Sequence, residues 1–183
     1  MSYTRRHLPH WVPEDADVFV TWRLAGTSPK TPGPAVLTDN RIAKIVSEAL
    51  LFGESTRRAY RLHAWVIMPN HVHAVLRPHS PLPATMQWLK TATARRANRI
   101  LKRVGIPFWQ EESFDHWIRK TEHLEDLILY VENNPVRAGL VESADLWPWS
   151  SAKAGNRVEK PPPEGISGFG WEGLLLYSIS EFA

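Results

Sequence analysis

The sequence predicts a single α+β domain with a ferredoxin-like, split β-α-β arrangement, in which an antiparallel sheet has its helices packed on one face. The main observation is the order of the apolar patterns, which runs strand, helix, strand, strand, helix, strand. The length of 183 residues suits one domain, and the 43% of hydrophobic residues, including nine Trp, suffice for a sizeable core. Disorder over the whole chain is excluded by this composition.

Four strands are expected from runs of β-branched and aromatic residues that end at turn-forming residues. They cover residues 17–24, 60–68, 71–77 and 114–118. The loop after the first strand has three prolines within residues 28–34. Because only Pro69-Asn70 separates the second strand from the third, these two form a hairpin with a very short turn.

Three helices are expected from apolar residues at 3.6-residue spacing. The first is capped by Thr38-Asp39 and ends at Gly53, and the second is a long basic helix over residues 84–104. The third begins at Thr121 and has acidic residues in its first turns. It must end near Asn133-Asn134-Pro135, because a residue before proline resists the helical conformation.

Several classes of protein are excluded by the composition. The longest apolar stretches fall far short of the roughly 18 residues that span a bilayer, and the N-terminus lacks the apolar core of a secretory signal. A cytoplasmic protein without membrane contacts is therefore expected. The absence of Cys excludes disulfides, zinc ribbons, thiol nucleophiles and iron–sulfur clusters, so any metal must be bound by His, carboxylate or amide oxygen.

Positive charge is concentrated in the middle of the chain. Residues 55–110 contain ten Lys or Arg and no Asp or Glu, whereas the other 127 residues contain twelve basic and nineteen acidic ones. A solvated helix face is the ordinary explanation for such residues, but it usually has acidic partners one helical turn away, and this segment has none. The pattern therefore favours a polyanionic partner such as a nucleic acid.

Two histidines, His71 and His73, are candidate metal ligands. Residues two apart on a strand point to the same face, so both imidazoles can reach one ion while Val72 points the other way. The same spacing fits a satisfied polar pair on an exposed face equally well, so both interpretations stay open.

A second pair, Tyr130 and Asn134, lies four residues apart on the third expected helix. This spacing puts both side chains on one face, where Asn134 can offer an amide oxygen to a hard cation with Tyr130 beside it. The simpler interpretation is that Tyr130 is a core tyrosine and that the residues after it end the helix. Spacing alone favours this simpler interpretation.

Four separated segments, taken together, favour a functional interpretation of these residues over the structural one. They are residues 65–73 (WVIMPNHVH), residues 108–115 (FWQEESFD), Tyr130 with residues 133–141 (NNPVRAGLV), and residues 147–152 (WPWSSA). In this order they resemble the REP-associated tyrosine transposases, which belong to the single-tyrosine HUH transposases. The resemblance runs from about residue 5 to residue 152, and we expect residues 1–152 to form the transposase-like domain. Residues 153–183 are expected to be a linker and a C-terminal tail.

The resemblance implies a metal-dependent endonuclease and strand transferase that acts on single-stranded DNA with hairpins. Tyr130 would attack a phosphodiester and leave a 5′-phosphotyrosine and a free 3′-hydroxyl. His71, His73 and Asn134 would hold Mg²⁺ or Mn²⁺, which would polarise the phosphate oxygens. Further contacts with DNA are expected from basic residues: Arg5, Arg6, Lys90, Arg95, Arg96, Arg99, Lys102 and Arg103.

The remaining expectations concern base stacking, rival functions and assembly. Trp88 or Trp109 could stack on unpaired bases, although Trp in such a domain more often belongs to the core. Two rival functions stay open, a hairpin-binding module that does not cut and a phosphodiesterase that activates water. A monomer is expected, with a dimer as the alternative.

Overall fold

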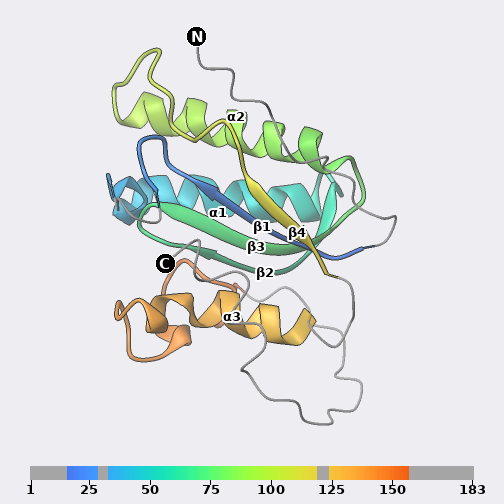
Figure 1. Cartoon of the computed structure of the whole chain (residues 1–183). Coiled ribbons are helices and arrows are strands. Elements are labelled where there is room, and N and C mark those ends of the chain that lie inside the picture. The colour runs from blue at the N-terminus through green and yellow to red at the C-terminus, as the bar shows by residue number, and fades with distance from the viewer. Residues whose placement is uncertain (1–15, 29–32, 119–123, 157–183) are drawn as a thin grey trace.

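The structure, a computed structural model, describes residues 16–28, 33–118 and 124–156 (Figure 1). Its strands are β1 Val18–Arg23, β2 Tyr60–Ile67, β3 His71–Pro78 and β4 Phe114–Trp117. Its helices are α1 Asn40–Ser55, α2 Leu82–Ile100 and α3 Leu124–Arg137, with short 3-10 helices η1 Val36–Thr38 and η3 Ala144–Leu146. Every strand and helix expected from the sequence is therefore present.

The four strands form one antiparallel sheet in the order β2-β3-β1-β4, with β1 and β3 in the centre. Along the chain the elements follow one another as β1-α1-β2-β3-α2-β4. This is the split β-α-β arrangement of a ferredoxin-like fold, so the predicted α+β class is confirmed. No described helix combines the length and the apolar character needed to cross a membrane.

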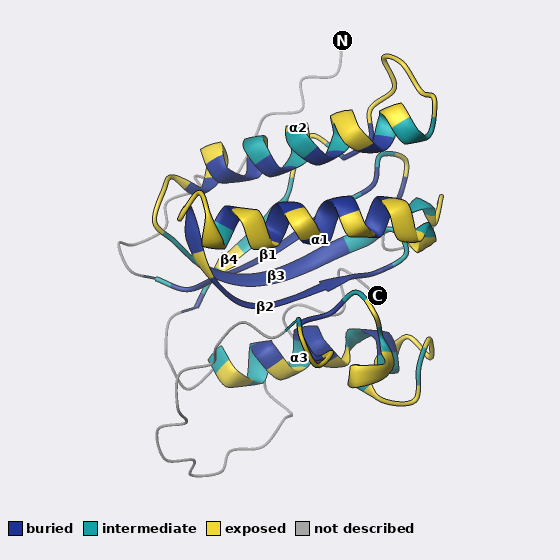
Figure 2. Cartoon of the chain, turned by 180° about the vertical axis from the view of Figure 1, so that it is seen from behind, coloured by how far each residue is buried: buried dark blue, intermediate teal, exposed yellow. Residues whose placement is uncertain are grey.

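Helices cover both faces of the sheet (Figure 1, Figure 2). The prediction of helices on one face holds for α1 and α2 and is wrong for α3, which covers the opposite face. The reason is that β1 is buried on both sides. Val18, Val20 and Trp22 belong to the apolar cluster of α1 and α2, whereas Phe19 belongs to a smaller cluster with Ile128 of α3.

The sequence predicts that the third helix ends near residues 133–135, and helix α3 ends at Arg137, two residues beyond Pro135. Proline removes one helical hydrogen bond, but the next turn still closes because Ala138 N donates to Asn134 O at 3.0 Å. Pro135 is itself buried, so its ring adds to the packing of the helix. The expected cap, Thr121, lies outside the described residues.

Helix α2 also differs at its ends from the predicted range of 84–104. It begins two residues earlier, at Leu82, and its last residue is Ile100. The early end has a local cause, because Lys102 adopts a left-handed backbone with φ of 53°, which cannot continue a helix.

The segment of residues 147–152 lies along the outer edge of β2. Ile67 N donates to Trp149 O at 2.8 Å, and Ser151 N donates to Trp65 O at 2.9 Å. One of the four segments that carry the family resemblance therefore covers the β2 edge of the sheet and lies close to α3.

Candidate active site

The α3 face of the sheet carries polar side chains at one end. Alternation along β3 puts His71 and His73 on this face, while Val72 joins the apolar cluster on the other face, as predicted. The antiparallel register pairs His73 with Thr21 and His71 with Arg23, both on β1. Cross-strand partners share a face, so four polar side chains meet on the face that α3 covers.

The two imidazoles converge through their Nε2 atoms, which lie 3.0 Å apart. His71 Nδ1 is 2.6 Å from Asn70 Oδ1, and because a carbonyl oxygen only accepts, this nitrogen donates and the Nε2 of His71 keeps its lone pair. His73 Nδ1 is 2.7 Å from Thr21 Oγ1, a hydroxyl that can accept in the same way. In the tautomer in which His73 Nδ1 donates to Thr21 Oγ1, the Nε2 lone pairs of both histidines face the same point, which is the arrangement that a shared metal ion needs.

Burial keeps both imidazoles uncharged. It lowers the pKa of His71 to about 3, with a further contribution from the positive charge of Arg23. It also holds the pKa of His73 well below its usual value, again with contributions from His71 and Arg23. Neutral imidazole is the form that binds metal ions, so the pair can accept a cation at neutral pH without losing a proton first.

The geometry and chemistry of this pair fit a divalent cation. Two ligand atoms about 2.1 Å from an ion and at right angles to each other lie about 3.0 Å apart, which matches the Nε2 separation. The contacts with Thr21 and Asn70 fix the ring orientations, as the outer partners of metal-binding histidines do. In the part of the chain that the structure describes, no group of three or more His, Asp or Glu side chains is placed to hold a metal ion. The amide of Asn134 stays the predicted third ligand.

Tyr130 lies close to the histidine pair and is half-buried. Its ring centroid is 6.2 Å from that of His73 and 6.1 Å from that of Phe19, which stacks on His73 at 5.4 Å. The ring thus packs against the smaller apolar cluster and also lies beside the histidine pair, and its role as the nucleophile stays a prediction. Tyr60, by contrast, is buried and donates to Leu50 O at 2.7 Å, which makes its hydroxyl unavailable as a nucleophile.

Asn134 lies one helical turn beyond Tyr130 and is half-buried. Its Nδ2 donates to Tyr130 O at 3.2 Å, which orients the amide and uses its nitrogen. The oxygen is therefore the atom of this amide suited to a cation. The tyrosine and the amide come from α3 and the imidazoles from β3, two elements that pack against each other.

Two arginines beside Tyr130 belong to the site, although the motif spacings do not indicate them. Arg137 places its Cζ 5.1 Å from the centroid of the Tyr130 ring. Arg23 is half-buried at the end of β1, where burial lowers its pKa and Tyr130 opposes that shift. A signal for Arg23 exists in the sequence, because Thr21 and Arg23 are polar residues two apart in an otherwise apolar strand.

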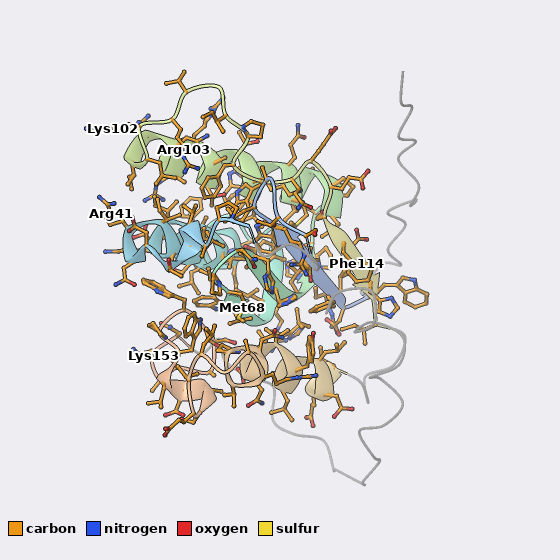
Figure 3. All side chains as sticks on the ribbon, turned by 60° about the vertical axis from the view of Figure 1, so that its left-hand side comes forward. Arg41, Met68, Lys102, Arg103, Phe114 and Lys153 are labelled. Carbon is orange, nitrogen blue, oxygen red and sulfur yellow. The ribbon has the colours of Figure 1, made fainter. Side chains whose placement is uncertain are left out.

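Most of the basic residues predicted to bind DNA lie on or after α2, on the other side of the sheet from α3 (Figure 3). Lys90 Nζ donates to the backbone oxygens of Gln110 and Glu111, both at 3.0 Å. Arg96 forms an ion pair of 2.8 Å with Glu48 of α1. The others on this side are exposed: Arg95, Arg99, Lys102 and Arg103. Two more lie outside the described residues, Arg5 and Arg6.

The two tryptophans considered for base stacking have different surroundings. Trp109 is 6% exposed, and its Nε1 donates to Thr93 Oγ1 at 2.8 Å. Trp109 is therefore a core residue, and the prediction that DNA bases stack on it is wrong. Trp88 is half-buried, with Arg57 Cζ 4.5 Å from its ring centroid. Stacking of bases on Trp88 stays a prediction.

A buried polar contact ties α3 to the sheet. The carboxylate of Glu132, which is 5% exposed, accepts a hydrogen bond from Ser151 Oγ at 3.1 Å. The same hydroxyl accepts a hydrogen bond from Trp65 N on β2, also at 3.1 Å. Ser151 therefore links the helix that carries Tyr130 to the sheet that carries the histidine pair.

The fold and the site together define a small α+β domain with a converging imidazole pair and a tyrosine on a helix. Residues 35–134, more than half of the chain, match the family model described as "Transposase IS200 like". This range includes the four residues of the predicted catalytic and metal site: His71, His73, Tyr130 and Asn134. The chain belongs to the IS200-like transposase family.

Individual relatives agree with this family. The chain is 27% identical over 95 residues to the "REP-associated tyrosine transposase" of Escherichia coli (strain K12). That match covers 51% of this chain and 55% of the relative, so the chain spans about half the length of the curated protein it matches. The fold is also similar to that of a solved REP-associated tyrosine transposase bound to a REP hairpin, with a TM-score of 0.60, 20% identity and coverage of 92% of this chain and 100% of the other.

Proposed function

We propose that the protein is a metal-dependent endonuclease and strand transferase that nicks and rejoins single-stranded DNA at hairpins through a phosphotyrosine at Tyr130. The observation that carries the proposal is the arrangement of three rings. The Nε2 atoms of His71 and His73 lie 3.0 Å apart, and the Tyr130 ring centroid lies 6.2 Å from that of His73. Membership of the transposase family supports the same class of reaction.

The reaction exchanges one phosphoester bond for another. The Tyr130 oxygen loses its proton and forms a bond to phosphorus, while the bond from phosphorus to the 3′-oxygen breaks and that oxygen takes up a proton. The products are a 5′-phosphotyrosine and a free 3′-hydroxyl. Because the number of phosphoester bonds does not change, a second 3′-hydroxyl can reverse the step and join strands without ATP.

His71, His73 and Asn134 would hold Mg²⁺ or Mn²⁺, and imidazole ligands favour Mn²⁺. When bound, such an ion neutralises negative charge that builds up on the phosphate oxygens. The protein keeps both imidazoles neutral through burial and holds their rings through Thr21 and Asn70. A neutral set of ligands leaves the charge of the ion available to the phosphate.

The exposed basic residues of the α2 side would bind DNA away from the cleaved bond. Since α2 lies on the opposite side of the sheet from α3, the exposed basic side chains on and just after α2 suit the phosphates of a flanking stem: Arg95, Arg99, Lys102 and Arg103. Lys90 and Arg96, together with Arg5 and Arg6, would add to this contact. The REP hairpin bound by the related protein supports a hairpin as the substrate here. We further propose that the protein acts in the cytoplasm as a monomer.

The test is a denaturing gel of the protein mixed with Mn²⁺ and labelled single-stranded hairpin oligonucleotides, taken from palindromic repeats near its own gene. A labelled protein band that needs the metal and is absent from Tyr130→Phe is the expected result. Tyr60→Phe is the matched control and should keep the band, because the hydroxyl of Tyr60 bonds to Leu50 O inside the core.

Two other results would point to the rival functions. Cleavage without a covalent band would mean that water, and not Tyr130, is the nucleophile. Tight binding of hairpins without cleavage of any oligonucleotide would mean that the domain is a binding module, and His71→Ala would then leave its affinity for DNA unchanged.

A further inference from the structure

Arg23 ends β1 inside the candidate site. It pairs in register with His71, and alternation along β1 puts its side chain on the α3 face. The backbone around it is fixed from two sides, because Gln110 N donates to Arg23 O and Leu24 N donates to Asn70 O, both at 2.9 Å. Asn70 is also the residue that holds the ring of His71. The position of Arg23 is therefore coupled to that of the histidine pair.

The positive charge of Arg23 acts on all three rings of the site. It interacts electrostatically with Tyr130, and it opposes protonation of His71 and His73. Apart from Arg23 and Arg137, the polar side chains of the site are uncharged: Thr21, Asn70 and Asn134. An uncharged set of ligands with an arginine beside it has a positive potential, which attracts a phosphodiester anion. Half-burial strengthens this attraction, because water screens the charge less than at the open surface.

We propose that Arg23 is a catalytic residue that binds the phosphodiester cleaved by Tyr130 and stabilises the negative charge that builds up on it. This inference rests on the function proposed above. A guanidinium can donate two parallel hydrogen bonds to two phosphate oxygens, a geometry that the ammonium group of lysine does not offer. Arg23 stays protonated throughout, so the balance of bonds and protons in the reaction is unchanged.

This role gives two effects of opposite sign. A cation next to the histidine pair repels a metal ion, so Arg23→Gln should bind Mn²⁺ more tightly than the wild type. The same substitution removes the partner of the phosphate, so it should form the covalent adduct more slowly. A residue that only supports the fold would weaken metal binding and adduct formation together.

The experiment compares four proteins: wild type, Arg23→Gln, Arg23→Lys and Arg41→Gln. Arg41 is the matched control for loss of one positive charge, because it lies exposed at the start of α1 and pairs with Asp39 at 2.6 Å. Mn²⁺ affinity is measured without DNA, from the electron paramagnetic resonance signal of free Mn²⁺. Adduct formation is measured in a single turnover at saturating hairpin oligonucleotide and Mn²⁺, and thermal unfolding checks that each variant is folded.

We expect Arg23→Gln to form the adduct about 10²–10³-fold more slowly than the wild type. Its affinity for Mn²⁺ should rise by about 2–5-fold, because a repelling charge has been removed. Arg23→Lys keeps the charge and loses the planar pair of donors, so it should show an intermediate rate with the Mn²⁺ affinity of the wild type. Arg41→Gln should match the wild type in both measurements.

Several results would overturn the inference. If the wild type forms the adduct and Arg23→Gln forms it at the same rate, the inference fails while the proposed function stands. If Arg23→Gln loses both Mn²⁺ binding and adduct formation, the inference also fails, because this result would mean that Arg23 only supports the fold. If the wild type forms no adduct at all, the proposed function fails, and this inference fails with it because it rests on that function. If Arg23→Gln does not fold, Arg23→Lys decides, because a wild-type rate would contradict the inference and a slower rate with unchanged Mn²⁺ affinity would support it.

Discussion

The two faces of the sheet bury different kinds of side chain. The face covered by α1 and α2 packs a large apolar cluster that includes Trp22 and Trp65. The face covered by α3 packs a smaller cluster and carries the histidine pair at one end. Because neighbouring residues of a strand point to opposite faces, β1 and β3 each contribute side chains to the large apolar cluster on one face and to the candidate site on the other. Substitutions on the two faces should therefore separate stability from activity.

The largest expected effect is on stability, at Trp22 on the α1 and α2 face. Trp22 is 2% exposed and packs edge-to-face against Trp109, with ring centroids 6.2 Å apart. Trp22→Ala should lower the free energy of unfolding by about 3–5 kcal/mol, measured by urea denaturation. The Mn²⁺ affinity of the folded fraction should stay that of the wild type. A marked loss of Mn²⁺ affinity in fully folded Trp22→Ala would show that the two faces are not independent.

The next effect is on metal binding, at Thr21 on the α3 face. Thr21→Val removes the hydroxyl that holds His73 Nδ1 at 2.7 Å, so Mn²⁺ affinity should fall by about 10–100-fold. The free energy of unfolding should fall by only about 1 kcal/mol. Thr27→Val is the matched control, because its buried hydroxyl donates to Leu24 O at 2.8 Å outside the site. Equal Mn²⁺ affinities in the two variants would contradict a positioning role for Thr21.

Ser151 should affect both stability and activity, because it joins α3 to the sheet. Ser151→Ala leaves the Glu132 carboxylate and Trp65 N without this partner, so the free energy of unfolding should fall by about 1–3 kcal/mol. Adduct formation should slow, while Mn²⁺ affinity should persist because the histidine pair lies on β3. Ser47→Ala, which removes a buried hydroxyl on α1, serves as the control. An unchanged adduct rate in a destabilised Ser151→Ala would show that α3 keeps its position without this contact.

The smallest effect is expected on stability at low pH. It concerns Asp17, which lies at the end of the α3 face away from the histidine pair. Asp17 bonds to His63 at 2.8 Å and to Arg77 at 2.7 Å. Burial raises the pKa of Asp17, but the hydrogen bonds from His63 and Arg77 outweigh it, and the net pKa is lowered. A lowered pKa means that the stabilisation is complete above the unfolded-state value of about 3.9 and is lost as the pH falls below it.

The matched variant for this effect is Asp17→Asn, which cannot ionise. The wild type should lose more stability than this variant when the pH is lowered from 7 to 3, as followed by urea denaturation at each pH. Parallel losses in the two proteins would mean that Asp17 does not contribute to the acid sensitivity.

Local spacing was enough to predict part of the site. Period-two alternation indicates that His71 and His73 share a face, and their Nε2 atoms indeed converge. Helical spacing indicates that Tyr130 and Asn134 lie one turn apart, and a hydrogen bond joins them. The same rules identified every described strand and α-helix, because each depends on residues close together in the sequence, but they did not indicate the 3-10 helices η1 and η3.

Features that depend on distant pairings could not be predicted in this way. The approach of Arg23 to His71 follows from the register between β1 and β3, and the contact between Ser151 and Trp65 joins residues 86 positions apart. The face that α3 covers is likewise fixed by which apolar surface the strands leave open. The roles of the site residues, the identity of the metal and the separation of residues 153–183 from the domain stay predictions.

The link from Ser151 to Glu132 also sets an order of assembly. The ribosome makes the chain from its N-terminus, so β3 and its histidine pair exist before α3 has been made. Helix α3 gains its anchor later still, when residues 147–152 can pair with β2. Under the proposed function, the histidine pair would therefore be present in the growing chain before Tyr130, the proposed nucleophile, is anchored beside it by the contact between Ser151 and Glu132.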